Sequence, residues 1–114
     1  MYYIGMIVLV TNKATKEDIK NASQEFGDYI KIVADIKRET VAMGGKLHAD
    51  AEGILIENGS KQEDIWGGGY DFTAKRIETT AFINIRPNLE NDNMEILNSD
   101  IRNRFIDLVN KILL

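Results

Sequence analysis

A histidine and two carboxylates alternate with apolar residues in the middle of the chain, at positions 48, 50 and 52. In a β-strand, residues two positions apart project from the same face, with Cα atoms about 7 Å apart. An imidazole with two carboxylates suits a divalent metal such as Mn²⁺ or Fe²⁺, or proton transfer near neutral pH. His48, Asp50 and Glu52 therefore form one candidate site. The same spacing is also typical of a solvated sheet face whose charged side chains form ordinary ion pairs.

A second candidate site combines an aromatic ring with flexible backbone. Gln62, Asp64 and Trp66 alternate in the same way and precede three glycines at 67–69. An exposed ring beside glycines could admit a ligand, because glycine permits close approach to the backbone. The alternative is that the glycines only form a loop between strands and that Trp66 belongs to the core.

The third group is Asn84, Arg86 and Pro87, just before a polar stretch. Arg86 could bind a carboxylate or phosphate with two parallel N–H groups. An arginine at a strand end more often pairs with a local acid, and Glu90 and Glu95 are the nearest candidates. We therefore favour the local ion pair over an anion site.

No stronger catalytic motif is present. The glycines fit neither a Walker loop nor a dinucleotide fingerprint, and no serine occupies a nucleophile elbow. The chain has no cysteine, which excludes thiolate metal sites and cysteine nucleophiles. Any mechanism that needs an imidazole depends on His48, the only histidine.

The composition is that of one soluble domain. A chain of 114 residues, 44% hydrophobic and 28% charged, resembles neither disordered nor membrane proteins. The net charge of −4, with scattered basic residues, predicts no nucleic-acid partner. The apolar run 1–10 is too short to cross a bilayer and lacks a cleavage site, so we expect a cytoplasmic protein without a membrane partner.

Helices are predicted near both ends of the chain. Thr15 and Asp18 form a capping-box variant that begins one helix, and Gly27 ends it. Before it, the apolar run Tyr3 to Val10 predicts a buried strand. A second helix is capped near Ser99, because five apolar residues recur at helical spacing: Ile101, Phe105, Leu108, Val109 and Ile112.

Two glycine-containing pairs, Gly44–Gly45 and Asn58–Gly59, predict tight hairpin turns. They divide the middle of the chain into strands over 28–42, 47–57 and 60–66, and Ile77 to Arg86 predicts a fourth. This register places Arg38 beside Asp64 as a buried ion pair. A helix over 28–42 is the competing interpretation, although its apolar residues form no clear stripe.

These elements predict an α+β fold in the order β-α-β-β-β-β-α. An antiparallel meander sheet is packed by the N-terminal and the C-terminal helix, with a short extended piece at 94–96 between the last strand and the last helix. Residues 1–114 form a single domain.

Four short motifs occur in a specific order: GGKLHAD at 44–50, GSKQEDIWG at 59–67, INIRP at 83–87 and MEI at 94–96. Together they resemble a family of short uncharacterised prokaryotic proteins, a domain of unknown function, over about residues 28 to 110. The resemblance implies no activity and carries over no catalytic residue. Asp71, Asp92 and Asn93 depart from the family pattern, which weakens an anion site near Arg86.

Two functions follow as hypotheses. The first is a non-catalytic binding or interaction module without a cofactor, with a second copy of the chain as a candidate partner and no small-molecule ligand that can be named. The second is a small metal-assisted hydrolase, in which His48 and Asp50 bind a divalent metal and Glu52 is a ligand or base.

Overall fold

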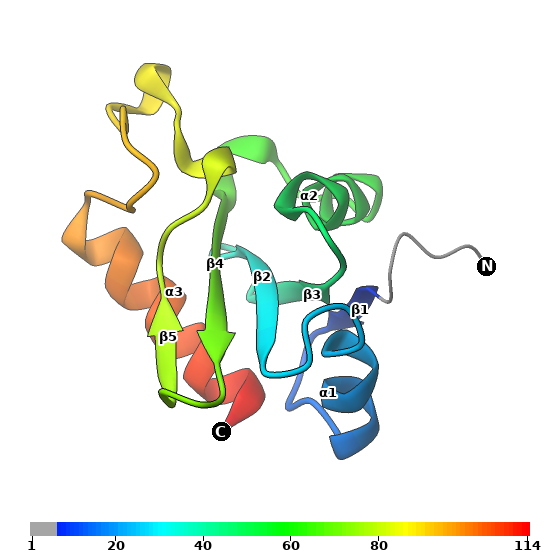
Figure 1. Cartoon of the computed structure of the whole chain (residues 1–114). Coiled ribbons are helices and arrows are strands. Elements are labelled where there is room, and N and C mark those ends of the chain that lie inside the picture. The colour runs from blue at the N-terminus through cyan, green and yellow to red at the C-terminus, as the bar shows by residue number, and fades with distance from the viewer. Residues whose placement is uncertain (1–6) are drawn as a thin grey trace.

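The computed structural model describes residues 7–114 and contains an antiparallel five-stranded sheet with three helices. The sheet has the order β1-β3-β2-β4-β5 (Figure 1). The strands are β1 (Ile7–Val10), β2 (Tyr29–Asp35), β3 (Thr40–Gly44), β4 (Ile65–Asp71) and β5 (Arg76–Glu78). The helices are α1 (Lys16–Ala22), α2 (His48–Glu57) and α3 (Ser99–Leu113). The predicted α+β class is confirmed, and the part of the first predicted strand before residue 7 lies outside the described residues.

The helices cover the two faces of the sheet unequally. Helices α1 and α3 pack on one face, and α3 is seen behind β4 and β5 in Figure 1. Helix α2 packs alone on the other face, over a smaller cluster: Val33, Ala42, Ala51, Leu55 and Ile65. The α2 face of the sheet therefore has the smaller of the two apolar clusters.

Both terminal helices agree with the prediction. Thr15 is the N-cap of α1, and its side chain and that of Asp18 bond each other's backbone N–H, as a capping box requires. The helix ends at Ala22, earlier than Gly27. Helix α3 begins at Ser99, with Asn98 as its N-cap, and its predicted apolar stripe contains the buried residues Phe105, Leu108, Val109 and Ile112.

The predicted strand over 47–57 is wrong, because this segment is helix α2. The pair Asn58–Gly59 ends the helix instead of turning a hairpin. The Gly59 N–H donates to the Ile56 carbonyl, the Ser60 N–H donates to the Leu55 carbonyl, and Gly59 has a φ of 101°. These bonds are a Schellman motif, in which glycine is preferred at the residue with positive φ.

The first predicted turn is also misplaced. Strands β2 and β3 reverse between Asp35 and Thr40, which pair directly, so 28–42 is neither one strand nor a helix. The Asp35 carboxylate stabilises this turn by accepting the backbone N–H groups of Lys37 and Arg38. Gly44 and its neighbour Gly45 have positive φ and lead from β3 towards α2.

The three glycines at 67–69 lie inside β4 and not in a loop. A side chain at any of them would overlap a neighbour: Ala81 at Gly67, the Glu78 carbonyl oxygen and Phe105 at Gly68, and Tyr29 at Gly69. They are present because both faces of this strand are closely covered, as expected where another chain segment approaches the backbone.

The last predicted strand is shorter than expected. Strand β5 covers only 76–78, and residues 79–97 form an irregular lobe with two 3₁₀ turns, Phe82–Asn84 and Pro87–Leu89. The lobe closes on itself where Thr80 pairs with Glu95 and the Ala81 N–H donates to the Met94 carbonyl. We refer to residues 79–97 as the lobe.

Candidate functional site

The helical conformation of α2 separates the three residues that were expected to share a strand face. His48 and Glu52 are four positions apart and lie on one side of the helix, whereas Asp50 is two positions from each and points elsewhere. His48 bonds the Gly68 carbonyl of β4, and Glu52 bonds Arg86 of the lobe. Within residues 7–114, no group of three or more His, Cys, Asp or Glu side chains could hold a metal ion. The metal site expected from these three residues is therefore not formed.

Arg86 joins α2, the lobe and the start of β4. Its Nη2 donates to the Glu52 carboxylate at 2.7 Å, and its Nη1 donates to the carbonyls of Gln62, at 2.8 Å, and Ile65. Only 9% of the Arg86 side chain and 13% of the Glu52 side chain are exposed. Burial lowers the pKa of Arg86, and the Glu52 carboxylate opposes that effect. The expected local pair with Glu90 or Glu95 is wrong, because the partner comes from α2.

Asn84 attaches the lobe to β4, because its side-chain amide forms the two backbone hydrogen bonds that a neighbouring strand would form. Its Oδ1 accepts the Gly67 N–H at 2.8 Å, and its Nδ2 donates to the Gly67 carbonyl at 2.9 Å. The same Nδ2 donates to the Met94 carbonyl at 2.9 Å on the other side of the lobe. Asn84 is completely buried, so these bonds satisfy its amide inside the protein.

Asn91 holds the interior of the lobe together and was not among the predicted site residues. Its Nδ2 donates to the carbonyls of Asn84, Asn93 and Glu95, and its Oδ1 accepts the Leu97 N–H. Its sequence context shows only a polar stretch, which gives no signal for a buried amide. With Asn84, it replaces the sheet hydrogen bonds that an irregular segment lacks.

The remaining predicted site residues have separate positions. Gln62 is exposed and contributes its backbone carbonyl, and the Asp64 carbonyl accepts the Ile36 N–H. Trp66 is 2% exposed and belongs to the core on the α3 side, with its ring centroid 5.4 Å from the Arg86 guanidinium carbon. The predicted pair of Arg38 and Asp64 is wrong, since Arg38 is exposed and donates to the Asn58 carbonyl.

His48 is held in one tautomer. Its Nε2 lies 2.7 Å from the Gly68 carbonyl oxygen, which can only accept, so Nε2 carries the proton. Burial lowers the pKa of His48 below its ordinary value of 6.5, and the charge of Lys31 lowers it further, against the hydrogen bond to Gly68. The imidazole is therefore neutral at pH 7, with Nδ1 as its acceptor atom.

The lowered pKa of His48 predicts a pH-dependent stability. Below pH 6.5 the unfolded chain binds a proton at His48 more readily than the folded chain, so stability is lost as the pH falls through 6.5. We expect the wild type to lose stability relative to His48→Gln, by at most about 1.4 kcal/mol per pH unit. Urea unfolding of both proteins between pH 7.5 and pH 5 measures the difference, and parallel curves would contradict it.

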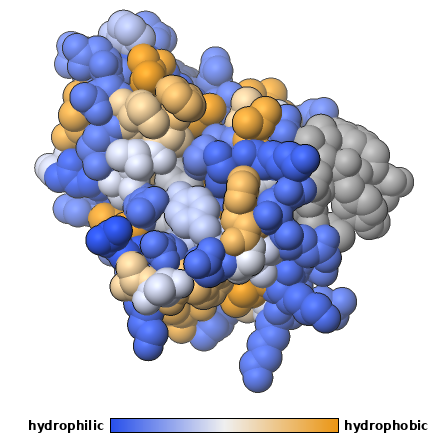
Figure 2. Space-filling model, viewed as in Figure 1, coloured by the Kyte–Doolittle hydropathy of each residue, from blue (hydrophilic) through white to orange (hydrophobic). Residues whose placement is uncertain are grey.

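Four large apolar side chains of the lobe are exposed. Phe82 is 76% exposed, and Ile85, Met94 and Leu97 are 44%, 38% and 46% exposed. The hydrogen bonds of Ala81 and Asn84 to the Met94 carbonyl keep the two sides of the lobe together. Figure 2 shows apolar side chains gathering over the upper part of the molecule, where Figure 1 places the lobe. We refer to these four residues as the apolar lobe surface.

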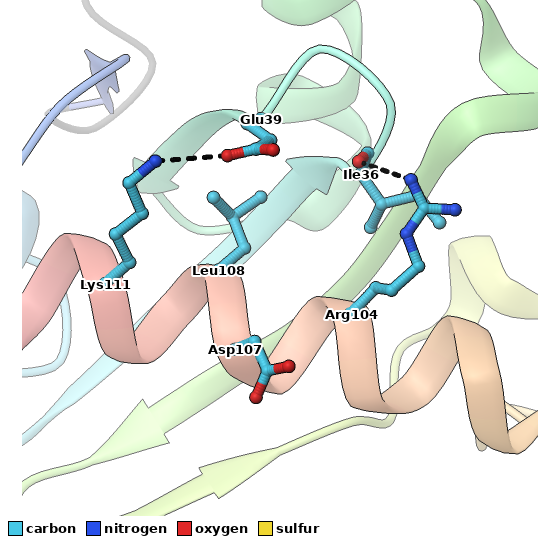
Figure 3. A pocket seen from close by; sticks show the side chains of 6 residues that line it. All are labelled: Ile36, Glu39, Arg104, Asp107, Leu108 and Lys111. Atoms are coloured by element: carbon cyan, nitrogen blue, oxygen red, sulfur yellow. Dashed lines mark hydrogen bonds and ion pairs between the residues drawn. The ribbon is translucent and has the colours of Figure 1, made fainter.

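Two shallow cavities lie at the protein surface. One, of about 240 Å³, lies between α3 and the turn after β2 (Figure 3). There Lys111 and Glu39 form an exposed ion pair, Arg104 donates to the Ile36 carbonyl, and Asp107 points away. The two acidic and the two basic side chains that line this cavity balance in charge. The other cavity, of about 270 Å³, adjoins the apolar lobe surface at Ile85 and includes four further residues of the lobe.

Comparisons with known proteins identify a family but no activity. A family model described as a protein of unknown function matches residues 8–112, which is most of the chain. Neither the curated proteins nor the solved structures contain a match. Among residues 7–114, no helix is both long enough and apolar enough to cross a membrane.

Proposed function

The chain belongs to the family Protein of unknown function (DUF5674), whose description names no activity, and we propose from the geometry that it is a non-catalytic protein-interaction module. The proposed contact surface is the apolar lobe surface, consisting of Phe82, Ile85, Met94 and Leu97. In this proposal the sheet and its helices are a scaffold, and the lobe is the part that meets the partner.

The observation that carries the proposal is the exposure of Phe82. A phenylalanine that is 76% exposed leaves most of a large apolar surface in water, and three further apolar side chains of the same lobe are at least 38% exposed. Clustered exposed apolar residues are typical of protein contact surfaces, and aromatic residues and methionine are enriched there.

The roles of the polar residues also support a module without catalysis. His48, Glu52, Asn84 and Arg86 each bond another element of the fold. Their bonds connect β4, α2 and the lobe, so they supply the rigidity on which a preformed contact surface depends. In this proposal the four side chains stabilise the fold and position the lobe.

A second copy of the chain stays a candidate partner in this proposal. The proposed location is the cytoplasm. Self-association through the apolar lobe surface would appear in light scattering as a dimer at micromolar concentration. The same measurement on Phe82→Ser would then give a monomer. The sequence prediction of a homodimer is tested directly by this comparison.

Truncation of the apolar lobe surface is expected to remove partner binding. The double variant Phe82→Ser/Met94→Ser removes one large apolar side chain from each of the two lobe segments that are joined by the hydrogen bond from Ala81 to Met94. Loss of an aromatic anchor typically costs about 2 kcal/mol of binding, which is roughly a 30-fold loss of affinity. Quantitative pull-down from a lysate of the native cells, with wild type and variant as baits, measures this loss.

The matched control is Phe26→Ser, which removes a phenylalanine that is 44% exposed and lies outside the lobe, near Lys31. We expect the control to retain the bound proteins and both variants to melt close to the wild type, because surface substitutions usually change stability by less than about 0.5 kcal/mol. Equal recovery of all proteins by the three baits would contradict the proposed surface.

A further inference from the structure

Every exposed charged side chain between residues 79 and 100 is acidic. Glu90, Asp92 and Asp100 are exposed, and Glu95 is partly buried and accepts a hydrogen bond from Thr79. The one basic residue in this range is Arg86, which is buried and paired with Glu52. The segment that carries the apolar lobe surface therefore also carries exposed carboxylates, and it has no exposed basic residue.

The cavity beside the apolar lobe surface has the same character. It measures about 270 Å³ and is lined on the lobe side by Ile85, Pro87 and Leu89, with the exposed Glu63 opposite. Arg86 also lines it, but its guanidinium is already bonded to a carboxylate and two carbonyls. The cavity thus offers three apolar side chains and the exposed Glu63 carboxylate, and the polar residues Gln62 and Asn88 complete its lining.

Cations near the lobe do not cancel this acidity. Arg102 is partly buried and donates to the Ile96 carbonyl, which holds it beneath the end of the lobe. Lys61 is exposed, but it precedes the segment that lines the cavity and is not one of its lining residues. Within the lobe itself, the exposed carboxylates of Glu90 and Asp92 have no exposed basic residue in the same segment.

The lobe is fixed before any partner arrives. The Asn84 side chain bonds the lobe to the backbone of β4, and the Asn91 side chain bonds backbone groups within the lobe. Arg86 adds bonds to α2 and to the start of β4. A contact surface that is already ordered loses little conformational entropy on binding. Recognition can then depend on matching shape and charge.

We infer that the partner is a protein segment whose apolar side chains are flanked by lysine or arginine. The inference rests on the proposed function and names the chemistry of its partner. The apolar side chains cover Phe82 and Met94, and the basic residues lie opposite Glu90, Asp92 and Glu63. Opposite charges across an interface increase both the association rate and the discrimination against wrong partners.

A second copy of the chain fits this surface less well. A two-fold interface places the same patch of each copy against the other, so the acidic residues around the lobe would approach one another. Like charges that are brought together across an interface disfavour the contact. The charge pattern therefore points away from self-association through the lobe and towards a basic partner.

Selection from a random peptide library tests the inference without a known ligand. A phage-displayed library is panned on the wild-type chain, and binders that also recognise Phe82→Ser/Met94→Ser are removed. The expected peptides carry at least two large apolar residues and a net positive charge. Synthetic copies should bind wild type and Phe26→Ser equally, and should bind Glu90→Lys/Asp92→Lys at least about tenfold more weakly. Their affinity should also fall as salt is raised.

The outcomes separate this inference from the proposed function. Lobe-dependent peptides that are neutral or acidic, or that bind Glu90→Lys/Asp92→Lys unchanged, would overturn the basic partner and leave the interaction surface standing. A dimer of the wild type that Phe82→Ser converts to a monomer would identify a second copy as the occupant and overturn the inference. A library that yields no lobe-dependent peptide would also count against it, and the pull-down then decides whether the surface binds at all.

Discussion

Replacing Arg86 with methionine is expected to lower the free energy of unfolding by about 3 kcal/mol. The substitution leaves the Glu52 carboxylate, which is 13% exposed, without its cation, and leaves the Gln62 and Ile65 carbonyls without their donor. Removal of one partner from a buried ion pair costs roughly 3 to 5 kcal/mol. Urea unfolding followed by circular dichroism at pH 7 measures the change.

Lys111→Met is the matched control, because it removes the cation of an ion pair whose two side chains are 60% and 63% exposed. An exposed pair of this kind contributes less than about 1 kcal/mol. The double variant Glu52→Leu/Arg86→Met should recover part of the loss, since it removes both buried charges. If Arg86→Met is no less stable than Lys111→Met, the buried pair does not hold the lobe in place.

Replacing Gly68 with alanine is expected to destabilise the fold by about 3 kcal/mol. The added methyl group would overlap the Glu78 carbonyl oxygen and lie 2.8 Å from the Phe105 ring. A side chain can rotate away, but the Glu78 carbonyl belongs to the backbone of β5 and can move only if the pairing of β4 with β5 opens. Overpacking that forces a backbone shift costs about 1 to 3 kcal/mol, and occasionally more.

Gly53→Ala provides the opposite expectation in the same protein. Gly53 lies inside α2, and, apart from its chain neighbours and the backbone of its own helix, an added methyl group would meet no described atom within 4 Å. Alanine in a helix interior is about 0.5 to 1 kcal/mol more favourable than glycine, so this variant should be more stable than the wild type. Thermal melts of the two variants give the comparison, and similar melting temperatures would contradict the packing around β4.

The elements with strong local signals were predictable from the sequence. The capping box of Thr15 with Asp18 and the apolar stripe of α3 each depend on residues within a few turns of one helix. Such patterns carry their own physical cause, because a cap satisfies free N–H groups and a stripe buries one face. The fold class followed from these helices and from the apolar strand runs.

The turns were misread because one sequence signal serves two structures. An asparagine–glycine pair supplies positive φ to a hairpin, and it supplies the same conformation to the end of a helix. Helix α2 has no strong apolar stripe that would have indicated the second option. The true turn after β2 contains Lys37, Arg38 and Glu39, and Glu39 adopts a positive φ of 53° without being glycine. The Asp35 carboxylate stabilises that turn, and this contribution is visible only in the structure.

The candidate site was half predictable for a related reason. His48, Glu52, Asn84 and Arg86 were all selected by residue type, and the structure brings them together along β4. Their partners could not be predicted, because Glu52 and Arg86 are 34 positions apart and meet only when 47–57 is a helix. The apolar lobe surface was missed because exposure of Phe82 depends on tertiary packing that no local pattern encodes.

The position of Trp66 gives the protein an intrinsic optical reporter. It is the only tryptophan of the chain, it is 2% exposed, and the Arg86 guanidinium carbon lies 5.4 Å from the centre of its ring. Fluorescence excited at the indole band therefore comes from a single environment in the interior, next to the residue that fastens α2 to the lobe. If the hydrogen bonds of Arg86 between α2 and the lobe break, the fluorescence emission of Trp66 should change. This change can be measured without an added label.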